Sequence, residues 1–227
     1  MSTTADAPRT SGRRVVRVKT LPAAARLFFQ HPSPRILVIA SVLAVALRLA
    51  IGHWHWSDAI AIGALVAWHP FSEWLIHVHI LHVQPGRGRV SDALDRAAGL
   101  SHRLHHEDPY DLRWQFIDRS TSIGFLVILG LINLAFRNHT ALSGTTTALV
   151  LATSYEWIHF LIHTDVPAKR WPYKQLHRAH RLHHYRNERY WLGVTMHAAD
   201  RILRTYPARD DVPVSATART ALAGLRR

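Results

Sequence analysis

The chain contains no cysteine among its 227 residues. This absence excludes disulfide bonds, thiolate zinc sites, iron–sulfur clusters and cysteine nucleophiles. Acidic residues are also few, since 15 Asp and Glu stand against 28 Lys and Arg, which gives a net charge of +13 with His counted as neutral. Metal chemistry in this chain would therefore depend on other ligands, and 18 histidines are available. The length is that of one domain.

Four apolar stretches interrupt the basic sequence. They cover residues 36–51, 59–76, 122–136 and 141–158. Each is about 15–18 residues long, slightly under the roughly 20 residues that cross a bilayer as a helix, although flanking aromatic side chains can extend it. A soluble bundle of unusually apolar helices is the alternative to a membrane protein with four spans.

The charge of the connecting segments favours the membrane. Residues 52–58 and 137–140 connect the first stretch to the second and the third to the fourth, and together they hold one basic residue, Arg137. The N-terminal arm, residues 83–120 and the chain after residue 164 are rich in Arg. By the positive-inside rule, this pattern predicts an all-α protein with four transmembrane helices and both termini in the cytoplasm.

The same pattern predicts three segments. We expect a disordered basic arm over residues 1–20, a membrane domain over 21–206 and a basic tail over 207–227. For the tail, an amphipathic helix on the membrane surface and disorder both stay open. Anionic lipid headgroups fit the basic excess better than nucleic acid does, because Lys and Arg are spread over all the expected cytosolic segments and no nucleic-acid motif is present.

The histidines include two identical triplets with the sequence HRLHH. One triplet comprises His102, His105 and His106, and the other comprises His180, His183 and His184. Because positions i, i+3 and i+4 lie on one face of a helix, we expect the three imidazoles of each triplet to point to one place. Neutral imidazole suits Fe, Zn, Cu and Ni, and it adds no anionic charge beside hydrocarbon.

A histidine pair precedes each triplet, at the end of an apolar stretch. His159 and His163 have the i, i+4 spacing of helical ligands, whereas His77 and His82 are five residues apart. On an ideal helix that spacing separates two side chains by about 140°, which indicates a helix end or a wider pair. Pairs and triplets together offer ten imidazoles, and an octahedral ion takes only six ligands. The sequence therefore implies two metal ions, bound on the cytosolic side.

Two glutamates and further histidines accompany these candidates. Glu73 lies four residues before His77, and Glu156 lies three before His159. Each carboxylate is thus expected on the same helix face as a candidate ligand, where it could accept a hydrogen bond from the other ring N–H of that histidine. The alternative is a bond to a neighbouring helix. His177 is a further candidate for the same outer position or for ligation, and His197 is a weaker one.

The order of pairs and triplets resembles the fatty acid hydroxylase/sterol desaturase superfamily of integral-membrane di-iron enzymes. The stretch HRLHHYRNERYWLGVTM from His180, with Asp200 soon after it, resembles the fatty acid 2-hydroxylases, and the resemblance covers about residues 70–206. It implies four membrane helices with a cytosolic helical cap that carries the metals. It identifies ten histidines as the ligands of a di-metal site: His77, His82, His102, His105, His106, His159, His163, His180, His183 and His184.

The resemblance also implies an activity. We expect O2-dependent hydroxylation of an unactivated C–H bond in a membrane lipid, with a fatty acyl chain as the first candidate, two Fe ions as cofactor and O2 as co-substrate. Zn could replace Fe in a purified sample. Two electrons would come from a separate donor, a reductase with a ferredoxin or a cytochrome b-type protein, since the chain holds no motif for a fused cytochrome domain.

Two alternatives stay open at this point. Desaturation, or oxidation of a sterol or carotenoid, would use the same site within the same superfamily. A histidine-rich metal-binding protein or transporter belongs to another class. That class is disfavoured because a transporter needs ligands at mid-membrane along a path, whereas these apolar stretches offer few ionisable side chains there.

Overall fold

The computed structural model describes residues 17–224, and within this range the chain is helical, with no strand. The long helices are α2 (Pro32–Ile51), α3 (Trp56–Ile76), α7 (Arg119–Phe136) and α8 (His139–Ile162). The shorter ones are α1 (Leu21–Phe28), α4 (Arg89–Leu94), α5 (Leu100–Glu107), α6 (Leu112–Gln115), α9 (Tyr173–Tyr185), α10 (Ala198–Ile202) and α11 (Ala216–Gly224). Two π-helical turns, His77–Leu81 and Asp95–Gly99, and a 3₁₀ turn, Arg209–Asp211, complete the order.

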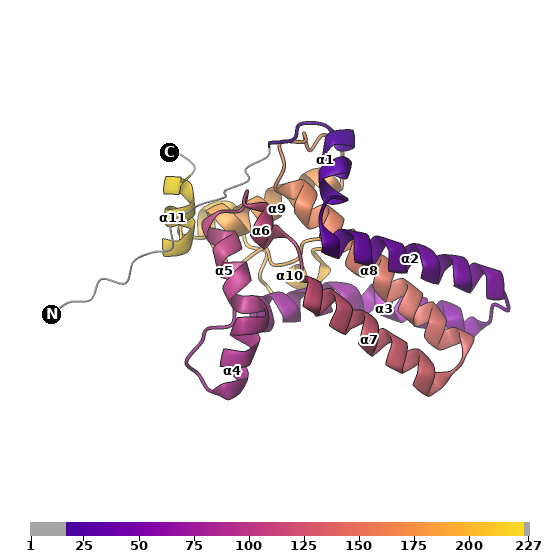
Figure 1. Cartoon of the computed structure of the whole chain (residues 1–227). Coiled ribbons are helices and arrows are strands. Elements are labelled where there is room, and N and C mark those ends of the chain that lie inside the picture. The colour runs from indigo at the N-terminus through magenta and orange to yellow at the C-terminus, as the bar shows by residue number, and fades with distance from the viewer. Residues whose placement is uncertain (1–16, 225–227) are drawn as a thin grey trace.

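The four long helices lie side by side as an elongated bundle, and the shorter helices gather at one of its ends (Figure 1). Three segments are long and apolar enough to cross a membrane, namely Pro32–Ile51, Trp56–Leu81 and Leu112–Phe136. Side chains on the outside of the bundle are apolar and more than half exposed, among them Val42, Leu47, Ile60, Ile128 and Leu134. Such a surface is unusual against water and suits lipid.

The fourth long helix, α8, is not among these three segments. It lies inside the bundle and packs against α2, α3 and α7. Its small polar side chains bond to these neighbours: Thr153 shares a 2.8 Å hydrogen bond with Ser41, and Thr145 accepts one of 2.5 Å from Asn133. A helix surrounded by other helices can carry more polar residues than one that faces lipid, because those groups find partners in the protein. Of the four spans expected from the sequence, three are therefore supported by length and apolar composition, and α8 is not.

Two tight connections close the bundle at the end away from the short helices. Gly52 has a φ of 62° and ends α2, and Arg137 has a φ of 49° and ends α7. Asn138 then begins α8, because its side chain accepts a hydrogen bond of 2.8 Å from the Ala141 amide. A left-handed residue followed by an N-cap reverses the chain within a few residues, so α3 runs antiparallel to α2, and α8 runs antiparallel to α7.

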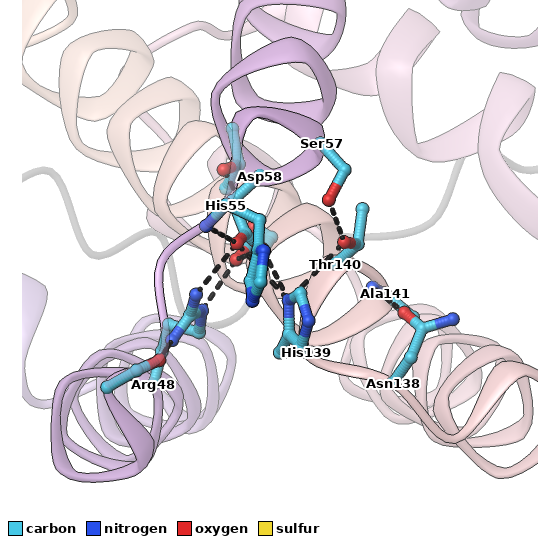
Figure 2. Close-up of polar contacts among 11 residues, drawn as sticks. Arg48, His55, Ser57, Asp58, Asn138, His139, Thr140 and Ala141 are labelled. Atoms are coloured by element: carbon cyan, nitrogen blue, oxygen red, sulfur yellow. Dashed lines mark hydrogen bonds and ion pairs between the residues drawn. The ribbon is translucent and has the colours of Figure 1, made fainter.

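A buried polar cluster ties these two connections together (Figure 2). Arg48 of α2 lies 3.2 Å from the carboxylate of Asp58 in α3, and the two side chains are 2% and 1% exposed. Asp58 also accepts hydrogen bonds from the hydroxyl of Ser143 (2.8 Å), the amide of His55 (2.9 Å) and the ring of His139 (3.2 Å). A buried ion pair is favourable only when its remaining hydrogen-bonding positions are filled, and here three donors, from α8 and the N-cap of α3, fill those of the carboxylate.

Helices α5, α9, α10 and α11 lie around the opposite end of the bundle (Figure 1). An aromatic core joins α1 to α8 there, with the ring of Phe28 5.0 Å from Trp157 and 5.6 Å from Phe160. The arm expected over residues 1–20 lies outside the described residues up to position 16, and Val18 already packs in this core. The expected tail contains helix α11, which packs against α5 and α9.

Candidate metal centre

The histidine pair of α3 is formed by a π-helical turn. His77 lies in the first position of this turn, and the His82 amide donates to the His77 carbonyl over 3.0 Å, an i+5 to i bond. The wider turn brings side chains five residues apart towards one face. The two rings stack with centroids 5.1 Å apart and planes 14° apart. The five-residue spacing thus has a defined structural basis, a widened turn at the helix end that the spacing indicated, with His82 as the C-cap.

The ten histidines form two groups of five. In the first histidine group, the Nε2 atom of His102 lies 3.2 Å from those of His77 and His106 and 3.3 Å from that of His82. His183 completes this group, with its Nε2 3.1 Å from that of His106. Its ligand nitrogens all lie within 4.8 Å of one another.

The second histidine group is built in the same way at the end of α8. The Nε2 atom of His163 lies 3.1 Å from that of His105 and 3.0 Å from that of His180. His184 follows at 3.1 Å from His180, and His159 is the fifth member. All five side chains are buried, as are four of the five in the first group, the exception being the partly exposed His82.

Each HRLHH triplet divides between the two groups, so the expectation that a triplet points to one place is wrong. His102 and His106 of α5 belong to the first group and His105 belongs to the second. At about 100° per residue, positions i and i+4 differ by roughly 40°, whereas i+3 lies about 60° to the other side. In α9 the assignment is reversed: His180 and His184 join the second group and His183 the first.

The donor set and its spacing fit two transition-metal ions. Nitrogens placed about 2.1 Å from a shared ion lie roughly 3.0–3.4 Å from one another, and the neighbouring Nε2 atoms are 3.0–3.4 Å apart. In His77 and His183 the Nδ1–H donates to a backbone carbonyl, so the neutral ring presents a bare lone pair at Nε2. Such converging lone pairs are the arrangement that a bound cation would stabilise.

The electrostatics keep these rings in the neutral form that binds a metal. Burial, reinforced by the neighbouring imidazoles, lowers the pKa well below its usual value for seven histidines outside the long apolar helices. They are His102, His105, His106, His163, His180, His183 and His184. For His82, burial and then the nearby Arg103 lower the pKa to about 4. At neutral pH no proton competes for these nitrogens.

The accompanying glutamates bond elsewhere, and the second-coordination role expected for them is absent from their contacts. Glu73 accepts from the Thr195 hydroxyl over 2.5 Å and lies 3.2 Å from His69. Glu156 accepts from Ser33 and from the Ile117 amide, both over 2.9 Å. Spacing along one helix identified the face of each carboxylate but not the partner from another segment. Glu156 thus takes the alternative role of a bond to a neighbouring helix, through Ser33 of α2, whereas Glu73 bonds to a loop.

His177 and His197 lie outside both histidine groups. The outer positions are taken by backbone groups that sequence reasoning missed. The Tyr190 carbonyl accepts from His183, the Leu192 carbonyl accepts from His77, and His159 hydrogen-bonds the backbone of Gln115. A backbone carbonyl is present at every position, so no residue type could have indicated these three.

Comparison with known proteins gives two matches. Residues 62–205, more than half of the chain, match the model of a protein family described as fatty acid hydroxylase. A solved structure described as full-length scs7p, with only the hydroxylase domain visible, matches with a TM-score of 0.62 and 21% sequence identity, over 81% of this chain and 68% of that one. At this identity the likeness concerns the fold. Among curated protein sequences, none matches.

Proposed function

The chain belongs to the fatty acid hydroxylase family, and on that premise we propose that it is a membrane-bound di-iron oxygenase. Its reaction would be the O2-dependent hydroxylation of an unactivated C–H bond in a lipid, with a fatty acyl chain as the first candidate. The observation that carries the proposal is the arrangement of ten imidazoles as two adjoining groups of five. A single metal would need one such group.

The protein residues would bind and shield the metal pair. When bound, two iron ions would supply the redox chemistry by which one oxygen atom of O2 enters the C–H bond and the other leaves as water, with two electrons and two protons from outside. All ten ligands are neutral imidazoles, and nine of them are buried, so the chain keeps bulk water away from the ions. The carbonyls of Tyr190 and Leu192 and the backbone of Gln115 hold three rings in orientation.

The position of the groups indicates where a lipid would react. His77 and His82 follow the apolar part of α3, and His159 and His163 lie at the end of α8. We propose that α8 is a fourth span enclosed by the other three, and that this end of the bundle faces the cytosol together with both termini. The reacting carbon would then lie near the headgroup level, which favours positions close to a polar head over the methyl end.

The partners are proposed from charge and chemistry. The basic segments at this end of the bundle would meet anionic lipid headgroups. Electrons would come from a separate reductase with a ferredoxin or a cytochrome b-type protein. Desaturation, or a sterol or carotenoid substrate, would use the same site. A metal transporter is supported less well, because the ten ligands gather at one end of the bundle instead of along a path through it.

Two measurements test the proposal. Protein reconstituted with ferrous ion without oxygen is expected to hold two irons per chain by elemental analysis. Lipid extracts of cells that contain the protein are expected to gain species heavier by about 16 mass units, the mass of one added oxygen atom. His105→Ala and His183→Ala, one from each group, provide matched controls that should lose metal and product. Iron-free protein would contradict the proposal, and products lighter by about two mass units would replace hydroxylation with desaturation.

A further inference from the structure

The segment after helix α9 returns to the first histidine group and orients two of its rings. The Nδ1–H of His183 donates to the Tyr190 carbonyl over 2.9 Å, and that of His77 donates to the Leu192 carbonyl over 2.6 Å. Both rings belong to the same group of five. Two carbonyls separated by one residue therefore determine where two Nε2 lone pairs of that group point.

The residue between the two carbonyls has an unusual backbone conformation. Trp191 has a φ of 55°, and its side chain is 1% exposed. A bulky residue rarely adopts this left-handed conformation, and it persists only where surrounding contacts enforce it. Here the Trp191 amide donates to the Thr205 carbonyl over 2.8 Å, and the ring packs with Ala179 and Val212. The conformation of the loop is thus imposed by its surroundings.

Asp200 is the buried group that fixes the loop. Its side chain is 0% exposed, and its carboxylate accepts from the amides of Leu192 (3.0 Å) and Gly193 (2.7 Å) and from the Thr205 hydroxyl (2.6 Å). A Cβ at Gly193 would lie 2.1 Å from the Met196 carbonyl oxygen, so only glycine allows this close approach. The bond from the Gly193 amide holds the peptide that carries the Leu192 carbonyl, and the bond from the Leu192 amide holds the preceding peptide.

Glu73 fixes the far end of the same loop. Its carboxylate accepts from the amide of Thr195 over 3.2 Å and from its hydroxyl over 2.5 Å. The loop from Leu192 to Thr195 is therefore held between two buried carboxylates, one from α10 and one from α3. Their placement explains why Glu73 lies one turn before His77 without contacting it.

The second histidine group has no such support from this loop. In the part of the chain that the structure describes, the buried Nδ1 atoms of His105, His180 and His184 have no hydrogen-bond partner. His159 is the member with a backbone partner, and that partner is Gln115, in a different segment. His106 of the first group also lacks a partner at Nδ1. The two groups thus differ in what orients their rings.

We propose that Asp200 is a positioning residue for one metal position, the one bound by the first histidine group. Acting through the Gly193 amide, it holds the peptide whose Leu192 carbonyl orients His77. Acting through Thr205, whose carbonyl accepts from the Trp191 amide, it holds the peptide whose Tyr190 carbonyl orients His183. The second group does not depend on it. This inference rests on the proposed function, because it requires that both groups bind metal. It predicts that the two metal ions are held unequally once the loop is loosened.

The test is Asp200→Asn, which keeps the size of the side chain but loses the charge and one acceptor. Purified full-length protein is loaded with Co(II) or Zn(II), and the metal per chain and its release to a chelator are measured. Wild type should release both ions slowly. The variant should release one of its two ions about 10–100-fold faster, as is typical when an outer hydrogen bond to a ligand is lost, with a matching loss of part of the cobalt absorption.

Three further variants make the result specific. Asp58→Asn is the matched control, since it makes the same change at a carboxylate that is also buried but lies at the start of α3, at the other end of the bundle. At a temperature where it is folded, it should keep both ions. Thr205→Val removes one bond to Asp200 and should release the same ion faster, while Thr205→Ser should restore retention. These two variants decide the question if Asp200→Asn does not fold.

The outcomes separate this inference from the proposed function. Wild-type protein without metal contradicts the proposed function. Wild type with two ions, together with an Asp200→Asn variant that loses both equally or neither, overturns the inference alone. After the chelator has removed the faster ion, adding His183→Ala in the Asp200→Asn background should remove no further metal, whereas adding His163→Ala should remove the remaining ion. The opposite result would mean that the faster ion belongs to the second histidine group, and it would also overturn the inference.

Discussion

Breaking the buried Arg48–Asp58 pair should destabilise the bundle strongly, whereas removing both charges together should not. The two side chains are 2% and 1% exposed and 3.2 Å apart. In Arg48→Met the carboxylate loses its arginine partner and keeps the hydrogen bonds from Ser143, the His55 amide and His139. An unpaired buried charge costs about 3–5 kcal/mol, so each single variant, Arg48→Met or Asp58→Asn, should lose that much unfolding free energy.

The double variant Arg48→Met/Asp58→Asn carries no net charge in the cluster. Asn keeps one oxygen for the His55 amide, and its NH2 group can donate to the Ser143 hydroxyl, which no longer accepts from Arg48. The double variant should therefore be more stable than either single one. The expected coupling energy is at least about 2 kcal/mol. Unfolding in detergent, followed by tryptophan fluorescence, measures it, and Trp54 is a local probe because Arg48 lies 3.7 Å above its ring. Effects that add within about 0.5 kcal/mol would refute the reasoning.

Three further predictions concern the metal centre and the turns. The pKa of His82 is about 4 in the fold against an ordinary 6.5, so the unfolded chain takes up a proton before the folded chain does. As pH falls from 6.5 to 4, metal-free protein should therefore lose up to about 1.4 kcal/mol of unfolding free energy per pH unit for such a group. A melting temperature that is equal at pH 7.5 and 5 would argue against the burial of His82. Gly193→Ala, whose Cβ would lie 2.1 Å from the Met196 carbonyl, should displace the loop and lower metal content, whereas Gly124→Ala, where the Cβ meets open space, should leave metal content unchanged. Asn138→Ala removes the N-cap of α8 and should cost about 1 kcal/mol of unfolding free energy without loss of metal; a larger cost than that of Arg48→Met would contradict the account of the turn.

The candidate ligands could be found from sequence because metal binding demands one residue type at repeated spacings. Pairs and triplets of histidine identified all ten side chains that the structure gathers. The division of each triplet could not be found, since it depends on the rotation of α5 and α9 relative to two neighbouring groups. The side chains of His105 and His183 point to the other histidine group than the rest of their triplet. Spacing along a helix predicts that the three side chains lie near one face, but it does not predict whether they bind one ion or two.

Other contacts could not be predicted, because the sequence does not show which distant residue a side chain or carbonyl bonds to. Glu73 was placed on the right face of α3, but its bond to Thr195 joins segments 122 residues apart. The carbonyls of Tyr190 and Leu192 belong to the backbone, so the residue types at these positions do not indicate that they accept hydrogen bonds from His183 and His77. Hydropathy identifies helices that face lipid, so it describes α2 better than α8, whose neighbours in the bundle satisfy its polar side chains.

The π-helical turn between His77 and His82 has a consequence for how the two halves of the chain are related. The turn holds one residue more than an α-helical turn would need to align two rings. Deleting one residue between His77 and His82 would give them the i, i+4 spacing of His159 and His163. The pair and the triplet of one half would then have the same internal spacings as those of the other. In the spacing of the histidine pairs the two halves thus differ by a single position, accommodated where the apolar helix ends and without loss of either imidazole.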